Sequence, residues 1–120
     1  ISFHPKIYPS RNGAGCHVNV STKKTRMKGG LKAIEKMMSK LEESHIDHIN
    51  VYGAGNDLRL TGECETSMYD EFSWGFGDRS ASVRIPSHVE VQGYGYFEDR
   101  RPAATCDPYL VTSKLLETLA

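Results

Sequence analysis

Arginines are prominent among the polar residues of this chain that could do chemistry. Arg59, Arg79, Arg84, Arg100 and Arg101 are each expected at the edge of a strand or turn, several of them beside a glycine, a serine or a carboxylate. A guanidinium group presents a planar fork of donors that suits carboxylate and phosphate groups. Several such groups converging indicate a site for an anionic substrate or a nucleotide. Any one of them alone could instead be a surface salt bridge to a nearby Asp or Glu.

A second group combines an imidazole, a carboxylate and a guanidinium. Glu98 and Arg100 are two residues apart in an expected strand, so their side chains project from one face. His17 lies on the polar face of another expected strand, next to glycines that let a ligand approach the backbone. One imidazole and one carboxylate suit Mg²⁺ or Mn²⁺ completed by other oxygen atoms better than a structural zinc site. The alternative is that His17 binds no metal.

The spacing of Arg79 and Arg84 sets a condition on the structure. The two residues are five apart, so an ideal strand would direct their side chains to opposite faces. They can share one site only if Arg79 precedes the strand or the chain bends between them.

Alternation of apolar and polar residues predicts the strands that carry these groups. Residues 66–77, rich in Ser, Gly and aromatic side chains, are expected to be irregular. The last strand is expected to follow its predecessor in a hairpin-like return. The segments expected as strands are 1–3, 16–21, 81–85 and 93–100.

Two amphipathic helices are expected. Apolar residues recur at helical spacing over residues 31–44, and a second helix begins at Pro108 with Asp107 as its N-cap. His45 and His48 follow the first helix, where a cationic side chain is favoured; an H-x-x-H metal pair is the alternative. The fold class predicted is α+β, an antiparallel sheet with the two main helices packed on one side.

Composition narrows the class of protein. With 120 residues and 38% hydrophobic side chains, the chain is expected to form a single domain, residues 1–120. Its fifteen basic and fifteen acidic side chains cancel, which removes the attraction that nucleic-acid-coating proteins rely on, so no nucleic acid is expected. No apolar run is long enough to predict a membrane span, and the first residues do not have the pattern of a signal peptide. The odd set of Cys16, Cys64 and Cys106 predicts reduced thiols in a cytoplasmic protein.

Five blocks of residues, in this order, resemble the catalytic domain of eukaryotic-type glutamine synthetase. Together they extend over nearly the whole chain, which makes the joint match far more specific than any single block. The blocks are residues 12–17 (NGAGCH), 59–62 with 65–67 (RLTG, ETS), 79–86 (RSASVRIP), 95–102 (GYFEDRRP) and 106–109 (CDPY).

The resemblance implies an ATP-dependent ligase that joins ammonia to the γ-carboxylate of glutamate through γ-glutamyl phosphate. It implies Mg²⁺ or Mn²⁺ as cofactor and ATP as co-substrate, and a full-length homo-oligomer of two pentameric rings. Phosphoryl transfer of this kind depends on positioning and charge neutralisation more than on covalent help from the protein.

The resemblance also implies roles for particular residues. His17 and Glu98 would be metal ligands, and Glu65 would lie on a loop that closes over the site and takes a proton from ammonium. Arg79 would be catalytic, steadying the charge of the transferring phosphoryl group. The implied binding residues are Asn12, Gly13, Arg59, Arg79 and Arg100 for glutamate, and Asn19, Val20, Ser21, Arg79, Arg84, Tyr96, Phe97 and Glu98 for ATP.

Several departures from the family pattern bear on substrate choice. Cys64 stands where the family usually has His, and Asp78 where it usually has Asn; Ser10 and Arg11 also differ. The family's amino-terminal domain and its upstream metal-binding strands have no counterpart here, so we expect the isolated chain to be inactive. We also expect open sheet edges that associate. The alternatives are a non-catalytic relative that serves as a structural or binding module, and a related γ-glutamyl amine ligase.

Overall fold

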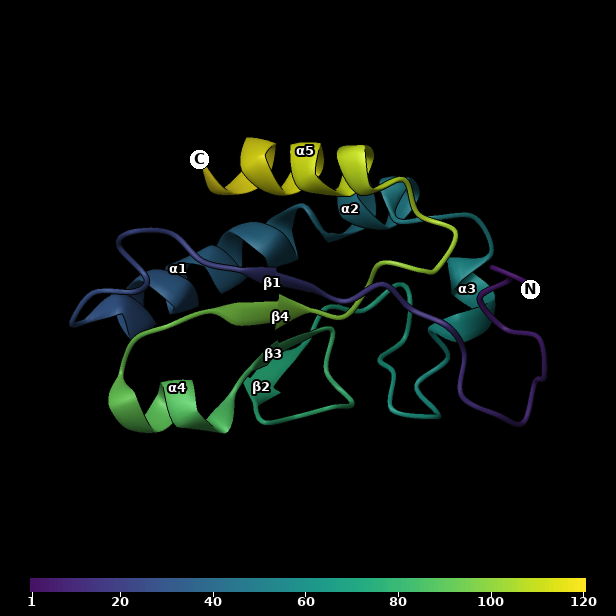
Figure 1. Ribbon diagram of the computed structural model, residues 1–120, viewed down its shortest axis with the longest axis horizontal. Coiled ribbons are helices and arrows are strands. Elements are labelled where there is room, and N and C mark those ends of the chain that lie inside the picture. The colour runs from purple at the N-terminus through teal and green to yellow at the C-terminus, as the bar shows by residue number, and fades with distance from the viewer.

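The computed structural model describes residues 1–120, which form four strands and five helices (Figure 1). The α+β class is therefore confirmed. Along the chain the elements are β1 (Val18–Val20), α1 (Gly30–Glu43), α2 (His45–Val51), α3 (Asn56–Arg59), β2 (Trp74–Phe76), β3 (Val83–Ile85), α4 (Ser87–Gln92), β4 (Phe97–Asp99) and α5 (Pro108–Leu119).

The four strands form one sheet in the order β1-β4-β3-β2. β4 is antiparallel to both of its neighbours, whereas β2 and β3 are parallel. The prediction of an antiparallel sheet is thus wrong at one edge. The reason lies in residues 66–77, expected to be irregular, which contain β2. A strand of three residues with a glycine at its centre is too short to show the alternation by which strands are recognised.

Other expected elements differ in detail. Residues 1–3 form no strand. The last strand, β4, does return antiparallel beside β3 as expected, but the connection between them contains α4 rather than a short turn. The helix expected over residues 31–44 is α1. The second expected helix is α5, where Asp107 Oδ1 accepts a hydrogen bond from the Tyr109 N–H at 2.9 Å and Pro108 takes the first helical position.

The hydrophobic core lies between the sheet and the helices α1 and α5, which run along the same side of the sheet with α2 (Figure 1). α1 contributes residues at helical spacing, and Met38 fills core space as expected. No helix in the structure has the length and apolar character required to cross a membrane. The buried core residues are Ile34, Met38, Leu41, Tyr52, Val83, Ile85, Val89, Phe97, Val111 and Leu115.

An ion pair between Arg101 and Asp99 lies inside this core. Arg101 and Asp99 are each 0% exposed, and Arg101 donates to both carboxylate oxygens, at 2.9 and 2.8 Å. The guanidinium of Arg101 also lies over the rings of Tyr52 and Phe72, at 5.1 and 5.3 Å from their centroids. Burial raises the pKa of Asp99, but the charge and hydrogen bonds of Arg101 outweigh it and leave that pKa lowered.

Two histidines extend this buried network toward the helices. The Arg101 Nη1–H donates to His45 Nδ1 at 3.0 Å, which leaves His45 Nε2–H to donate to the Tyr69 carbonyl at 2.9 Å. Tyr52 donates to Asp99 at 2.7 Å and therefore accepts from His48 Nδ1–H, also at 2.7 Å. Each histidine is satisfied as a neutral ring.

His48 is thus not the helix-end cation that its position suggested. Burial, and next the charge of Arg101, lower the pKa of His48 to about 4. Its Nε2 lies 2.8 Å from Thr118 Oγ1, so the imidazole joins α2 to α5. The structure contains no group of three or more His, Cys, Asp and Glu side chains that could together hold a metal ion.

We expect stability to fall as the pH drops from about 6.5 to 4. The unfolded chain binds a proton at His48 near its ordinary pKa of 6.5, whereas the folded chain resists protonation down to about 4. The stabilisation is therefore complete above pH 6.5, and about 2–3 kcal/mol of it is lost by pH 4. Urea titrations over this range measure the effect. His48→Gln should flatten the slope and His88→Gln, at an exposed position, should leave it unchanged; a flat profile in the unmodified chain contradicts the expectation.

Candidate functional site

Seven of the predicted site residues come together around one pocket. Its volume is about 170 Å³, and it is bordered by the segment before β1, the end of α3, the loop after α3, the turn before β3 and the residue after β4. The predicted residues that line it are Asn12, Gly13, His17, Arg59, Glu65, Arg79 and Arg100.

The carboxylate of Glu98 joins three strand segments behind this pocket. In the sheet Glu98 lies opposite Arg84 of β3, and the Arg84 Nε–H donates to it at 2.7 Å. His17 Nδ1 lies 3.1 Å from the other carboxylate oxygen, and Arg100 Nη1 donates to the carboxylate at 3.3 Å. We call these four residues the Glu98 cluster. The expected sharing of one face by Glu98 and Arg100 is confirmed.

Electrostatics hold the members of the Glu98 cluster in defined charge states. Burial raises the pKa of Glu98, but the hydrogen bond from Arg84 and the charge of Arg100 outweigh it and lower that pKa. Burial and the charge of Arg100 lower the pKa of His17, against the opposing effect of Glu98. At neutral pH the site therefore holds an ionised carboxylate beside a neutral imidazole.

Arg100 is a buried cation of the pocket, at 7% exposure. Besides Glu98, it donates through Nη2 to the carbonyl oxygen of Glu65 at 3.3 Å, so it fixes the loop that carries that residue. Its Nε–H is buried and has no hydrogen-bond partner. An unpaired buried donor costs free energy and is uncommon in folded proteins.

Arg59 is buried rather than placed at the surface. Its Nη2 donates to the carbonyl oxygens of Arg100, Arg101 and Pro102, at 3.1, 2.8 and 3.1 Å. Its Nε donates to Asn56 at 3.1 Å. Burial, and next the charge of Arg100, lower its pKa to about 10. Arg59 thus holds the chain after β4 in place.

Glycines allow Arg59 and His17 to approach the backbone. A Cβ atom at Gly15 would lie 2.9 Å from Arg59 Nη1 and 3.2 Å from His17 Nε2. At Gly13 it would collide with the Pro5 carbonyl oxygen and would lie 2.6 Å from Arg59 Cγ. The glycines of the segment 12–17 are therefore needed for close packing rather than for a special backbone conformation.

Glu65 and Arg79 face each other across the mouth of the pocket. Their charged groups are 3.8 Å apart, and both side chains are more than half exposed. Cys64 and Glu65 have left-handed backbone conformations, with φ of 53° and 59°. Non-glycine residues adopt this conformation at a cost, and such residues cluster at functional sites.

Arg79 precedes β3, which meets the condition set by its spacing from Arg84. It lies in a turn held by Asp78, whose Oδ1 accepts hydrogen bonds from the Ser80 backbone N–H at 2.8 Å and from its hydroxyl at 2.6 Å. These bonds lower the pKa of Asp78. Asp78 therefore positions the turn that presents Arg79.

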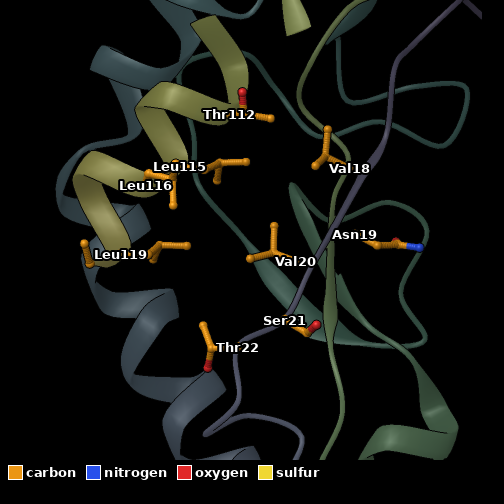
Figure 2. A pocket seen from close by; sticks show the side chains of 10 residues that line it. Val18, Asn19, Val20, Ser21, Thr22, Thr112, Leu115, Leu116 and Leu119 are labelled. Carbon is orange, nitrogen blue, oxygen red and sulfur yellow. The ribbon is translucent and has the colours of Figure 1, made fainter. Parts of the chain in front are cut away.

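The residues predicted for ATP are more dispersed. Figure 2 shows Val18 and Val20 pointing toward α5, where they line an apolar pocket of about 350 Å³ with Leu115, while Asn19 points away. The predicted alternation of β1 is thus confirmed, and it leaves Val20 on the apolar side.

Ser21 and Tyr96 border a separate hollow beside Gln92, of about 340 Å³. The Phe97 side chain is fully buried in the core. At Val20 and Phe97, therefore, only backbone atoms are placed to face a nucleotide on the polar side of the sheet.

His17 and Glu98 have the donor chemistry for a divalent cation. A neutral imidazole and an ionised carboxylate are common ligands of Mg²⁺ and Mn²⁺ when other oxygens complete the shell. In the structure the two groups are hydrogen-bonded to each other, and Glu98 also accepts hydrogen bonds from Arg84 and Arg100. The two side chains therefore have suitable chemistry for two ligands of such a cation and lie next to each other.

The sequence analysis assigned no site role to three residues of the pocket, Gly15, Cys64 and Thr66, although it marked Cys64 as a departure from the family pattern. Thr66 is buried, and its hydroxyl donates to the Glu63 carbonyl at 2.8 Å, which closes the loop around Glu65. The signal available in the sequence was their position within the resembling blocks or beside them. None of the three side chains is charged, so none stood out as a candidate.

The sequence of this chain is similar to those of known glutamine synthetases. The chain is 60% identical over 120 residues to the glutamine synthetase of Schizosaccharomyces pombe, a match covering 99% of the chain and 33% of that protein. It is 57% identical to that of Debaryomyces hansenii and 55% identical to that of Saccharomyces cerevisiae, again over 99% of the chain and 32% of each protein. The chain thus spans about a third of the length of the curated relatives it matches. No protein-family profile matches it.

Proposed function

Because this chain belongs to the glutamine synthetase family, we propose that it forms the substrate-binding part of a glutamate–ammonia ligase. The observation that carries the proposal is the convergence of three arginines on a pocket with a single lining carboxylate. Arg59, Arg79 and Arg100 meet Glu65 there, although they come from distant parts of the sequence. Such an excess of guanidinium groups suits a substrate with carboxylate and phosphate groups.

The deep and the exposed residues of the pocket have different roles in this proposal. Arg59 and Arg100 are buried and form the deeper wall; with Asn12 and Gly13, which also line the pocket, they would hold glutamate. Arg79 is exposed at the mouth, so it can turn toward the terminal phosphate of ATP as the γ-carboxylate attacks it. A guanidinium at this point stabilises the charge of the transferring group without any covalent step.

Glu65 would act as the base. Its carboxylate lies at the mouth beside Arg79, on a backbone in the left-handed region that Arg100 fixes through the carbonyl oxygen. A carboxylate within reach of the incoming nitrogen can take a proton from ammonium, and the ammonia left behind then attacks γ-glutamyl phosphate.

His17 and Glu98 would hold a divalent cation, Mg²⁺ or Mn²⁺, which supplies charge neutralisation for the phosphates of ATP when it is bound. Arg84 and Arg100 position Glu98 from both sides. Asn19, Ser21 and Tyr96 would border the nucleotide. We further propose a cytoplasmic protein that assembles as a homo-oligomer of two pentameric rings in its full-length form.

The test is a chimera in which this chain replaces the matching third of the Schizosaccharomyces pombe enzyme. We expect glutamine formation from glutamate, ammonia and ATP within about tenfold of the parent rate, a difference of at most ~1.4 kcal/mol in activation free energy. The isolated chain should show no turnover, because it supplies only part of the metal site.

Circular dichroism and the oligomeric state of the chimera, compared with the parent enzyme, show whether it has folded. A folded and assembled chimera without turnover would refute the proposed function. Turnover by the isolated chain would refute the expectation that a complete site needs further residues.

A further inference from the structure

Cys16 and Cys106 lie on two segments that the backbone holds side by side. Gly15 and Ala103 form an antiparallel bridge, and the Cys16 N–H donates to the Pro102 carbonyl at 2.9 Å. The two cysteines are 90 positions apart in the sequence, and this pairing brings their segments into contact. Neither residue is part of the pocket described above.

A turn then brings Cys106 back toward this pairing. The Cys106 N–H donates to the Ala103 carbonyl at 3.0 Å, and the Ala103 N–H donates to the Tyr52 carbonyl at 2.8 Å. The Thr105 hydroxyl donates to the Ala54 carbonyl at 2.8 Å. The turn is therefore anchored from two sides, and the position of Cys106 does not depend on its own side chain.

The two thiols are neighbours within this scaffold. Burial and, to a smaller extent, the nearby Cys16 raise the pKa of Cys106 to about 11. Both residues are partly exposed, so a small oxidant can reach them. Both are free thiols in the structure, in line with the expectation from the sequence.

We propose that Cys16 and Cys106 are a modification site, at which a peroxide converts the two thiols into a reversible disulfide. The Cys16 thiolate attacks hydrogen peroxide, the O–O bond breaks, and Cys16 becomes a sulfenic acid while the departing oxygen leaves as water. The Cys106 sulfur, giving up its proton, attacks the sulfenic sulfur; the S–S bond forms and a second water leaves. Two thiols are oxidised and one peroxide is reduced to two waters.

The reverse order, in which Cys106 is oxidised first, would give the same disulfide and the same two waters. The bond would join the residue before His17 to the residue before Asp107, the N-cap of α5. It would thus tie the candidate site to a helix on the other side of the sheet. The proposal does not depend on the proposed function.

The test is peptide mapping of the whole chain after brief treatment with hydrogen peroxide. Free thiols are blocked with N-ethylmaleimide, and the digest is analysed by mass spectrometry with and without dithiothreitol. We expect a linked pair of peptides containing Cys16 and Cys106, one blocked thiol at Cys64, and loss of the link on reduction. Closing so long a loop should also raise the Tm by roughly 10 °C.

Single variants separate this pairing from unspecific oxidation. Cys16→Ser and Cys106→Ser should each abolish the link and the rise in Tm, whereas Cys64→Ser should retain both. Circular dichroism before oxidation establishes that each variant is folded. Links that involve Cys64, or oxygen added to separate cysteines without a link between Cys16 and Cys106, would overturn the proposal.

Discussion

Replacing Asp99 with Asn is expected to lower the free energy of unfolding by about 3–5 kcal/mol. Arg101 is fully buried, and Asp99 accepts both of its strongest hydrogen bonds, at 2.8 and 2.9 Å. The Asn side chain keeps the shape but leaves the guanidinium without a counter-charge in an environment where water cannot reach it. Urea denaturation at neutral pH, followed by circular dichroism, measures the change.

An exposed ion pair in the same chain supplies the control. Lys114 and Glu117 lie 3.6 Å apart, with the Glu117 side chain 72% exposed. Glu117→Gln should cost no more than about 0.5 kcal/mol, because water replaces the lost partner. If Asp99→Asn lowers the free energy of unfolding as little as Glu117→Gln does, the buried ion pair does not stabilise the fold as we expect.

Arg79→Ala, made in the chimera with the Schizosaccharomyces pombe enzyme, is expected to lower kcat by about 100- to 1,000-fold. The side chain is 63% exposed and its ion-pair partner, Glu65, is 3.8 Å away, so the folded state gains little from it. In the proposed function, Arg79 stabilises the charge of the transferring phosphoryl group. Stability should therefore change by less than about 0.5 kcal/mol.

Steady-state kinetics and urea denaturation of the same preparations test this separation of effects. Lys114→Ala is the control, since it also removes a cation from an ion pair but does not line the pocket; the Lys114 side chain is 19% exposed. It should leave kcat unchanged. A fall in kcat shared by both variants, or an Arg79→Ala variant with full activity, would contradict the role given to Arg79.

The sequence predicted the elements with clear periodicity and missed those that are too short to have one. α1 and α5 follow from apolar spacing and from the Asp107–Pro108 start, which are local signals. β2 and α4 are 3 and 6 residues long, and neither length allows a pattern to be recognised. β2 in particular depends on its pairing with β3, which is a tertiary contact.

The candidate site was predictable as a set of residues but not as a set of contacts. The resemblance named Glu98 and Arg84, yet only the register of β3 against β4 shows that they are opposite each other. Strand alternation separates Arg100 from Arg101, but the sequence does not show that one lines the pocket while the other is paired in the core. The difference is the alternation of side chains along one strand and its extension.

That alternation gives the segment 98–101 an unusual sensitivity. Glu98 and Arg100 face the pocket, while Asp99 and Arg101 face the core, so the same two charges occur on each side of one backbone. A substitution here damages one side and leaves the other intact. An insertion or deletion of a single residue would instead exchange the two faces and break both sets of ion pairs at once. The length of this segment is therefore constrained at least as strictly as its composition.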